Sequence, residues 1–374
     1  MIYLDNGATS FPKLPQVRRA VADALAWCAN PGRGGHEASM AAARGVYRCR
    51  ERAAALFGCR PEQVAFTSNC THGLNIAIRS LVKPGSRVLV SGFEHNSVMR
   101  PLYAMGTRVT VAGRKLFDPA DTLSRFEDAL KLGTDAVVFT HASNVFGYVL
   151  PVAELSALCR RYGVPFVVDA AQSAGTEEID MDAWGADFVA MPGHKGLLGP
   201  MGTGLLLCGK TPEPLLYGGT GTESLRREMP EDLPERLEAG TVNVPGIAGL
   251  EAGLAYLQRA GIHRIRRREE AEARRCAAGL DTLGLRVFAG SSQNGTVSFL
   301  AQGDCEELAA ELGRRGAAVR AGLHCAPLAH ESAGTLDTGT VRVSFGAGCT
   351  PAQTDKFLDI MAGVLKTRKG IICQ

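Results

Sequence analysis

A lysine and an aspartate in the middle of the chain could do chemistry together. Asp169 ends the apolar run 164–168, and Lys195 follows a second apolar run, 187–191, within Gly193-His194-Lys195. Open α/β sheets bind ligands at the carboxyl ends of their strands, which is where both side chains fall. A lysine there can form a Schiff base with a carbonyl cofactor, and an aspartate can pair with a protonated pyridine nitrogen. Alone, each has an ordinary alternative, a surface lysine or a helix-capping aspartate. Together they predict a pyridoxal phosphate (PLP) site.

A turn of small polar residues could hold the cofactor phosphate. Residues 68–73, Ser-Asn-Cys-Thr-His-Gly, follow the strand-like segment 63–66 and precede a helix that starts near Leu74. Free backbone N–H groups at such a corner form an anion site, although any strand–helix corner offers some of them. His95 follows another strand-like segment, 87–90, and could stack on a cofactor ring, whereas a lone histidine is more often structural.

A cysteine and an arginine near the C-terminus form a second candidate set. Cys325 lies beside His324 in the segment 319–327, where a thiol can reach across a domain boundary and be kept partly as thiolate. The alternative is an inert buried thiol, which we expect for most of the other cysteines. Arg342 lies in the apolar segment 340–345, where a cation needs a partner, and its fork fits a substrate carboxylate.

One match to a nucleotide-binding pattern is rejected. Residues 204–211 fit GxxxxGK[ST] letter for letter. A phosphate loop must follow a strand, turn on small residues and open a helix. Here the four variable residues are themselves apolar and strand-like, and Pro212 and Pro214 stand where the helix should run. We predict a strand that leaves the sheet into a turn, with no nucleotide site.

Composition excludes several classes of protein. The chain has 374 residues, 45% hydrophobic and 21% charged, with a formal net charge of +3, so bulk charge gives no reason to expect nucleic acid. The 11 cysteines include no CxxC pair, which predicts neither a metal site nor a disulfide framework and fits a reducing compartment. The sequence begins with no targeting segment and has no apolar run long enough to span a bilayer, so we predict a cytoplasmic protein without membrane contact.

Apolar patterning predicts an α/β fold in two domains. Short apolar runs alternate with helical periodicity up to about residue 240, which is typical of a mostly parallel sheet flanked by helices. A long helical segment, 246–283, follows, and then a smaller α+β pattern. We predict an N-terminal arm at 1–15, a large domain at 16–245 and a small C-terminal domain at 246–374.

Taken in order, these segments resemble the PLP-dependent class V aminotransferase fold, and within it the cysteine desulfurase and selenocysteine lyase branch. The resemblance covers nearly the whole chain. Its motifs here are Tyr3-Leu4-Asp5-Asn6-Gly7-Ala8-Thr9, Arg33-Gly34-Gly35-His36, Thr71-His72-Gly73, Glu94-His95-Asn96, Asn144-Val145-Phe146-Gly147, Asp169-Ala170-Ala171-Gln172, Gly193-His194-Lys195, Glu238-Ala239-Gly240-Thr241 and Arg342-Val343-Ser344-Phe345-Gly346. It implies PLP fold type I, with a large PLP domain and a smaller domain that carries the Cys325 loop and Arg342.

The resemblance also implies a role for each matching residue. Lys195 resembles the Schiff-base lysine, Asp169 the partner of the pyridine nitrogen and His95 the ring stacked on PLP. The remaining implied cofactor ligands are Gln172 at the phenolic oxygen, Thr71, His72 and His194 around the phosphate, and Thr241 reaching the phosphate of a neighbouring subunit, which implies a homodimer. The implied substrate-binding residues are Asn144, Arg320 and Arg342, with Arg342 holding the carboxylate. Cys325 resembles the nucleophile that becomes a persulfide.

Two positions depart from the family pattern. The family has Ser or Thr two residues before the histidine of the lysine motif, and this chain has Pro192. Losing one charge-assisted bond to the phosphate would cost about 1.5–3 kcal/mol unless another donor, for which we consider Gly218–Thr222 of a second subunit, replaces it. The family's usual Asn-Thr after Arg342 is replaced by Cys349-Thr350, where Thr350 can still cap the following helix.

The resemblance implies a cysteine desulfurase, which converts L-cysteine to L-alanine and leaves a persulfide on Cys325. The alternatives are a selenocysteine lyase acting on L-selenocysteine, another PLP-dependent C–S lyase or a class V transaminase. A non-catalytic scaffold of the same fold is a further alternative, to which only Pro192 points. A protein sulfur acceptor is expected, and its identity stays open. Cys373, in the C-terminal tail, is expected to be an incidental thiol.

Overall fold

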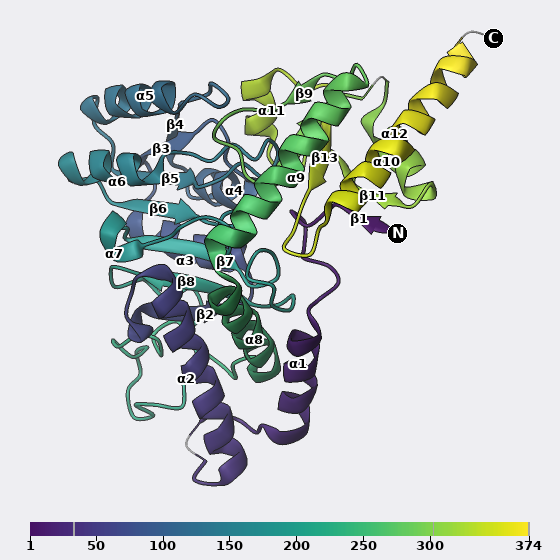
Figure 1. Cartoon of the computed structure of the whole chain (residues 1–374). Coiled ribbons are helices and arrows are strands. Elements are labelled where there is room, and N and C mark those ends of the chain that lie inside the picture. The colour runs from purple at the N-terminus through teal and green to yellow at the C-terminus, as the bar shows by residue number, and fades with distance from the viewer. Residues whose placement is uncertain (33, 302, 373–374) are drawn as a thin grey trace.

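The short apolar runs of the first two thirds of the chain form one sheet, as the sequence predicts. A computed structural model describes residues 1–32, 34–301 and 303–372 (Figure 1). Arg33 and Cys373, singled out above, lie outside the described residues. Within the described chain, the largest sheet has seven strands in the order β2 (Val64–Thr67), β8 (Gly204–Cys208), β7 (Phe188–Pro192), β6 (Phe166–Asp169), β5 (Ala136–Thr140), β3 (Arg87–Ser91) and β4 (Arg108–Ala112).

Most neighbours in this sheet are parallel. Strands β7, β6, β5, β3 and β4 pair in parallel, whereas β8 is antiparallel to both of its neighbours, β7 and β2. Residues 204–208 of the rejected nucleotide pattern are therefore a buried strand inside the sheet, as predicted. The α/β class with a mostly parallel sheet is confirmed.

Helices bury both faces of the sheet. In β6, Phe166 and Val168 belong to one apolar cluster and Val167 to another, because successive strand side chains point to opposite faces. A short 3₁₀ turn (Pro61–Gln63) precedes β2, and the helices between the strands are α3 (Cys70–Leu81), α4 (Asn96–Ala104), α5 (Pro119–Lys131), α6 (Val152–Arg161) and α7 (Met181–Trp184). Helix α3 begins four residues before Leu74, because the side chain of Asn69 caps it by accepting from the N–H of His72 at 2.9 Å.

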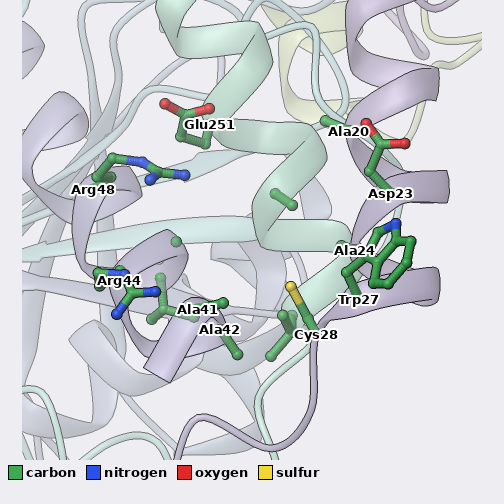
Figure 2. Close-up of a pocket in the computed structure, with 14 residues that line it drawn as sticks. Ala20, Asp23, Ala24, Trp27, Cys28, Ala41, Ala42, Arg44, Arg48 and Glu251 are labelled. Atoms are coloured by element: carbon green, nitrogen blue, oxygen red, sulfur yellow. The ribbon is translucent and has the colours of Figure 1, made fainter. Parts of the chain in front are cut away.

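Three helices pack together beside the sheet. These are α1 (Pro15–Trp27), α2 (Glu37–Phe57) and α8 (Val244–Ala260), and α8 packs on both of the others. Between them lies a cavity of about 350 Å³ that Trp27, Cys28, Arg44 and Glu251 help to line (Figure 2). No predicted site residue is among the described residues that line this cavity, so it is not the candidate site.

The helical segment predicted over 246–283 is borne out, with one interruption. The structure has two helices there, α8 and α9 (Ile262–Thr282), separated by Gly261. Gly261 has φ of +79°, a left-handed conformation that glycine adopts without steric cost, and its N–H bonds to the carbonyl of Leu257 to end α8. The predicted domain boundary near Pro245 falls in the first turn of α8 and stays a prediction.

The C-terminal third forms a second, antiparallel sheet with its own apolar cluster. Its strands run in the order β12 (Arg320–Gly322), β13 (Thr340–Ser344), β10 (Thr296–Phe299) and β9 (Val287–Phe288). Around it lie α9, α10 (Cys305–Arg314), α11 (Pro327–Ala333) and α12 (Pro351–Ile372). The N-terminal β1 (Ile2–Tyr3) pairs in parallel with β11 (Ala317–Ala318), so the predicted arm is tied to this region (Figure 1). Among the described helices, none is both long enough and apolar enough to cross a membrane.

Candidate active site

The carboxyl ends of β6 and β7 and the start of α3 surround a cavity of about 110 Å³. Side chains from several distant segments meet there. The predicted site residues that line it are Thr71, His95, Asn144, Asp169, Gln172, His194 and Lys195. Parallel strands bring their carboxyl ends to one edge of the sheet, which is why residues so far apart in sequence converge.

Asp169 is the last residue of β6 and is buried at the base of the cavity. Its Oδ1 accepts hydrogen bonds from the backbone N–H of Ala171 at 2.9 Å and from the thiol of Cys70 at 3.4 Å. Burial raises the pKa of Asp169, while the Ala171 N–H, the charge of Lys195 and the Cys70 thiol act in the opposite direction. The carboxyl group therefore favours a cationic partner in the cavity.

Lys195 follows β7 in a turn fixed by backbone bonds. The N–H of Gly193 bonds to the carbonyl of Thr203 at 2.8 Å, and the N–H of Gly199 bonds to the carbonyl of Gly193 at 2.7 Å. Burial lowers the pKa of the Lys195 ammonium, the charge of Arg342 lowers it further, and Asp169 opposes the shift. A lowered pKa leaves more of the amine neutral, the form that attacks a carbonyl group.

Hydroxyl and imidazole groups lie at the phosphate end predicted from the sequence. Thr71 Oγ1 and Ser97 Oγ are 2.8 Å apart. His194 Nδ1 is buried without a partner among the described residues, an orphaned polar atom that a ligand can satisfy. His72 does not line the cavity, since its Nδ1 lies 3.3 Å from the N–H and the hydroxyl of Ser68. Pro192 lines the cavity and supplies no donor.

His95 caps α4 and also faces the cavity. Its Nδ1 accepts from the N–H of Ser97 at 3.0 Å and lies 2.9 Å from the Ser97 hydroxyl. Burial and the nearby positive charge of Lys195 lower the pKa of His95 to about 4. The ring is therefore neutral at neutral pH and is anchored by its helix cap.

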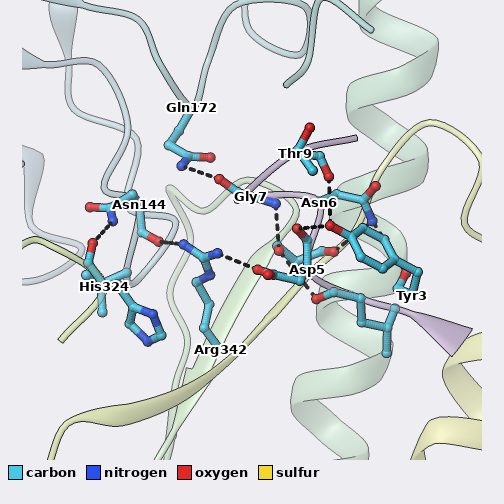
Figure 3. A network of polar contacts seen from close by, with 12 residues as sticks. Tyr3, Asp5, Asn6, Gly7, Thr9, Asn144, Gln172, His324 and Arg342 are labelled. Carbon is cyan, nitrogen blue, oxygen red and sulfur yellow. Dashed lines mark hydrogen bonds and ion pairs between the residues drawn. The ribbon is translucent and has the colours of Figure 1, made fainter. Parts of the chain in front are cut away.

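Arg342, on β13, lies in a network that joins three parts of the chain (Figure 3). One guanidinium nitrogen donates to the carbonyl of Asn144 at 2.8 Å, and another donates to Asp5 Oδ1 at 2.7 Å. Arg342 Nε and Asn144 Oδ1 are buried without partners among the described residues. Arg320 lies opposite Arg342 in the β12–β13 pair and is exposed. Gln172 donates to the carbonyl of Gly7 at 3.0 Å.

The Cys325 loop is tied to the cavity wall although Cys325 itself does not line the cavity. The carbonyl of Cys325 accepts from the N–H of Asn96, next to His95, at 2.8 Å, and the carbonyl of His324 accepts from Asn144 Nδ2 at 2.7 Å. Both His324 (φ +50°) and Cys325 (φ +57°) adopt the left-handed conformation that residues other than glycine rarely take. Cys325 is exposed.

The ring of His324 packs toward β13. Its ring is buried, with Nε2 3.2 Å from the carbonyl of Thr340, and burial lowers the pKa of His324 to about 2. The ring is therefore neutral at neutral pH and is held against β13.

Thr241 lies apart from the other predicted residues. It lines a different cavity, of about 600 Å³, together with Arg50, Glu238 and Thr220. Within one chain, the structure does not bring Thr241 or the segment Gly218–Thr222 to Lys195.

Sequence reasoning missed two residues that contact the site. Asp5 pairs with Arg342, and Cys70 contacts Asp169. Asp5 belongs to the N-terminal family motif, but nothing local in the sequence links it to an arginine near the other end. Cys70 stands in the predicted phosphate turn, and its position at the start of α3 was the available signal.

Comparisons with known proteins place this chain in one family. The family model for aminotransferase class-V matches residues 2–357, and the chain belongs to that family. The "Probable cysteine desulfurase" of Methanothermobacter thermautotrophicus is 35% identical over 92% of this chain and 89% of its own length. The protein of the same name from Pyrococcus abyssi is 32% identical over 98% of this chain and 95% of its own length.

A solved structure agrees with these relatives. The apo structure of cysteine desulfurase from Thermococcus onnurineus NA1 superposes with a TM-score of 0.89 at 33% identity, covering 98% of this chain and 95% of the other. The predicted family and fold are therefore confirmed.

Proposed function

We propose that this chain is a PLP-dependent cysteine desulfurase that forms L-alanine from L-cysteine and transfers the sulfur to Cys325. One observation carries the proposal: Lys195 and Asp169 share a cavity whose wall is bonded to the Cys325 loop through Asn96 and Asn144. The curated relatives and the solved structure of the same name support this activity over nearly the full chain.

The residues around the cavity suit PLP. Asp169 offers a carboxylate for the ring nitrogen, Lys195 an amine for the aldehyde and His95 a neutral ring for stacking. Thr71 and the orphaned His194 Nδ1 suit the phosphate, and Gln172 suits the phenolic oxygen. When bound, PLP supplies an electron sink that weakens bonds to the substrate Cα. His72 has a proposed role at the phosphate only if its ring turns away from Ser68.

Arg342 is the proposed receptor for the substrate carboxylate, and Asn144 is a proposed substrate-binding residue beside it. Arg342 Nε and Asn144 Oδ1 are buried without partners among the described residues. Nε is a donor that a carboxylate can satisfy, whereas Oδ1 is an acceptor that suits a donor group of the substrate. Arg320, on the adjacent strand, adds positive charge. We assign to Lys195 Nζ, once neutral, the removal of the substrate Cα proton and the later return of a proton to carbon.

Cys325 completes the proposed reaction. Its thiolate attacks the substrate sulfur, so that an S–S bond forms as the substrate Cβ–S bond breaks and the electron pair leaves with carbon. Protonation of that carbon gives alanine, and the sulfur stays on Cys325 as a persulfide. A reductant or a sulfur-acceptor protein then removes it. Because Cys325 is exposed on a loop, an acceptor can reach it.

We also propose a homodimer in which Thr241 of each chain reaches the phosphate site of the other. Thr241 is exposed and lines a cavity separate from Lys195, so a role at the phosphate requires a second chain.

The described cysteines are all free, which supports the cytoplasmic placement predicted from the sequence.

A product assay tests the proposed activity. Purified, PLP-loaded protein is incubated with L-cysteine and a thiol reductant, and alanine and sulfide are quantified together, with Lys195→Ala as the control. Equal amounts of both products, absent in the control, are expected. Pyruvate and ammonia would indicate β-elimination, dependence on a keto acid would indicate a transaminase, and turnover of L-selenocysteine alone would indicate the lyase. Failure to take up PLP would support the scaffold alternative.

A further inference from the structure

Cys70 places a thiol at the cofactor cavity, at the start of the helix α3 that packs on β6 and β7. It is the first residue of α3, directly after the capping residue Asn69, and only 8% of it is exposed. It lines the same cavity as Lys195 and Asp169. The proposed reaction gives the Cys70 thiol no role. Burial and the neighbouring Asp169 carboxylate raise the pKa of Cys70 well above its ordinary value, so the thiol stays protonated and is a poor nucleophile.

The two oxygens of Asp169 have different surroundings. Oδ1 accepts both the Cys70 thiol at 3.4 Å and the Ala171 N–H at 2.9 Å. Within the described chain, no hydrogen-bond donor reaches Oδ2, although Asp169 lines the cavity and is 2% exposed. Two donors from two different segments thus fix one oxygen, and the other is left for a ligand. A carboxylate held at one oxygen has a defined orientation at the other.

We propose that Cys70 is a positioning residue, whose thiol holds Asp169 Oδ1 so that Oδ2 is presented to the ring nitrogen of PLP. This inference rests on the proposed function, since it concerns how the carboxylate meets that cofactor. Cys70 itself contacts neither the substrate nor the reacting carbon. Its effect passes through Asp169 alone.

The direction of the pH effect follows from the charges around Asp169. Besides burial, the groups that act on the pKa of Asp169 are the Ala171 N–H, Lys195 after β7 and Cys70 on α3. Asp169 in turn raises the pKa of Glu94, before α4. The Cys70 hydrogen bond favours the ionised carboxylate, so its removal raises the pKa of Asp169. The ring nitrogen of PLP needs an ionised partner. PLP binding by a chain that lacks the Cys70 thiol should therefore weaken first at acidic pH. A substitution at Cys70 leaves Lys195 and Glu94 unchanged, so a difference from wild type in the pH dependence of PLP binding reports the effect of the Cys70 thiol.

A different role for Cys70 would be simple core packing. Its side chain belongs to an apolar cluster that also contains Leu74, Ala190 and Cys208. Cys208, on β8, is also buried, at 2% exposed, and its thiol makes no described hydrogen bond to Asp169; the thiol's described partner is the carbonyl of Leu206 at 3.9 Å. Cys208→Ala is therefore a matched control for loss of a buried thiol.

The test uses the full-length chain stripped of PLP and titrated with PLP at several pH values. The variants are Cys70→Ala, Cys70→Ser and Cys208→Ala, and the readouts are the PLP dissociation constant, the absorbance spectrum of bound PLP and the melting temperature of the PLP-free protein. We expect Cys70→Ala to weaken PLP binding about 3- to 10-fold, the range for one modest hydrogen bond. This loss of PLP affinity should grow as the pH falls. The absorbance spectrum of bound PLP should also change with pH at a different midpoint from wild type.

Serine keeps a donor at this position, so Cys70→Ser should restore affinity and pH dependence toward wild type. Cys208→Ala should change only the melting temperature. The inference is overturned if Cys70→Ala binds PLP with wild-type affinity and pH dependence, or if it and Cys208→Ala differ from wild type in the same way. A wild-type chain that binds no PLP would instead contradict the proposed function.

Discussion

Asp5 and Arg342 form an ion pair between the N-terminal arm and the strand that carries the predicted carboxylate-binding arginine, with Oδ1 and Nη2 2.7 Å apart (Figure 3). The Arg342 side chain is 3% exposed. Gly7 lies against the same guanidinium, because a Cβ at that position would come 3.2 Å from Arg342 Cζ. The arm thus determines where Arg342 lies relative to Asn144 and the cavity.

Asp5→Ala should impair both stability and substrate binding. Removing one partner of a buried pair leaves an uncompensated charge, which costs about 3 kcal/mol of unfolding free energy. The freed guanidinium should also lose its orientation, so KM for L-cysteine should rise at least about 10-fold with a smaller change in kcat. Urea unfolding and steady-state kinetics measure the two effects.

Asp135→Ala is the matched control for the loss of an ion pair. Asp135 pairs with Arg87 on the surface, where both side chains are about half exposed, and its Oδ2 accepts from the Arg87 N–H at 2.7 Å. Its loss should leave KM within experimental error and should lower stability less than Asp5→Ala does. If Asp5→Ala behaves like Asp135→Ala, the arm does not position Arg342.

Gly196→Ala should disrupt the lysine turn. A Cβ on Gly196 would lie 2.2 Å from the carbonyl oxygen of Ala174, a backbone atom that cannot move aside. We expect a loss of about 2–3 kcal/mol in unfolding free energy and weak PLP uptake, because Lys195 is displaced. Gly45→Ala is the comparison, since nothing lies within 4 Å of its added Cβ in the middle of α2. That change should raise stability by about 0.5–1 kcal/mol. Equal behaviour of the two variants would refute the close-packing argument.

Glu269→Gln should stabilise the protein at alkaline pH. Burial, with a contribution from the charge of Glu177, raises the pKa of Glu269 to about 8. An acid whose pKa is higher when folded than the usual 4.5 favours folding below about pH 4.5, and this contribution is lost as the pH rises through 8. Glutamine cannot ionise, so the variant does not lose this stability as the pH rises. Its unfolding free energy should exceed that of wild type by about 2 kcal/mol at pH 9 and differ little from it at pH 4. The exposed Glu51→Gln should show no such dependence, and the same curve for both variants would contradict the assignment.

Local sequence patterns were enough to predict the strands that carry the site and the placement of two of its residues. Apolar runs located the strands, and because parallel strands end at one edge of a sheet, those runs alone were enough to predict that Asp169 and Lys195 lie together. The rejected nucleotide pattern could also be judged from its residues, since an apolar run followed by two prolines cannot open a helix.

Features set by long-range packing could not be predicted in the same way. Helical periodicity continues on both sides of Gly261, so the end of α8 depends on one glycine in a left-handed conformation. The pairing of Asp5 with Arg342 joins the two ends of the chain, and no local pattern encodes it. The direction of the His324 ring follows from its burial against Thr340, whereas the sequence shows only that it precedes Cys325.

The central claim is that Cys325 takes sulfur from L-cysteine at the Lys195 site. The most direct measurement is a single turnover of PLP-loaded wild type and Cys325→Ser with L-cysteine and no reductant, followed by mass spectrometry of the 325-containing peptide and quantification of alanine. Wild type should gain one sulfur atom on Cys325 for each alanine formed. Cys325→Ser should retain the PLP spectrum, gain no sulfur and form alanine more than about 100-fold more slowly. Alanine and sulfide released by Cys325→Ser at the wild-type rate would contradict the account.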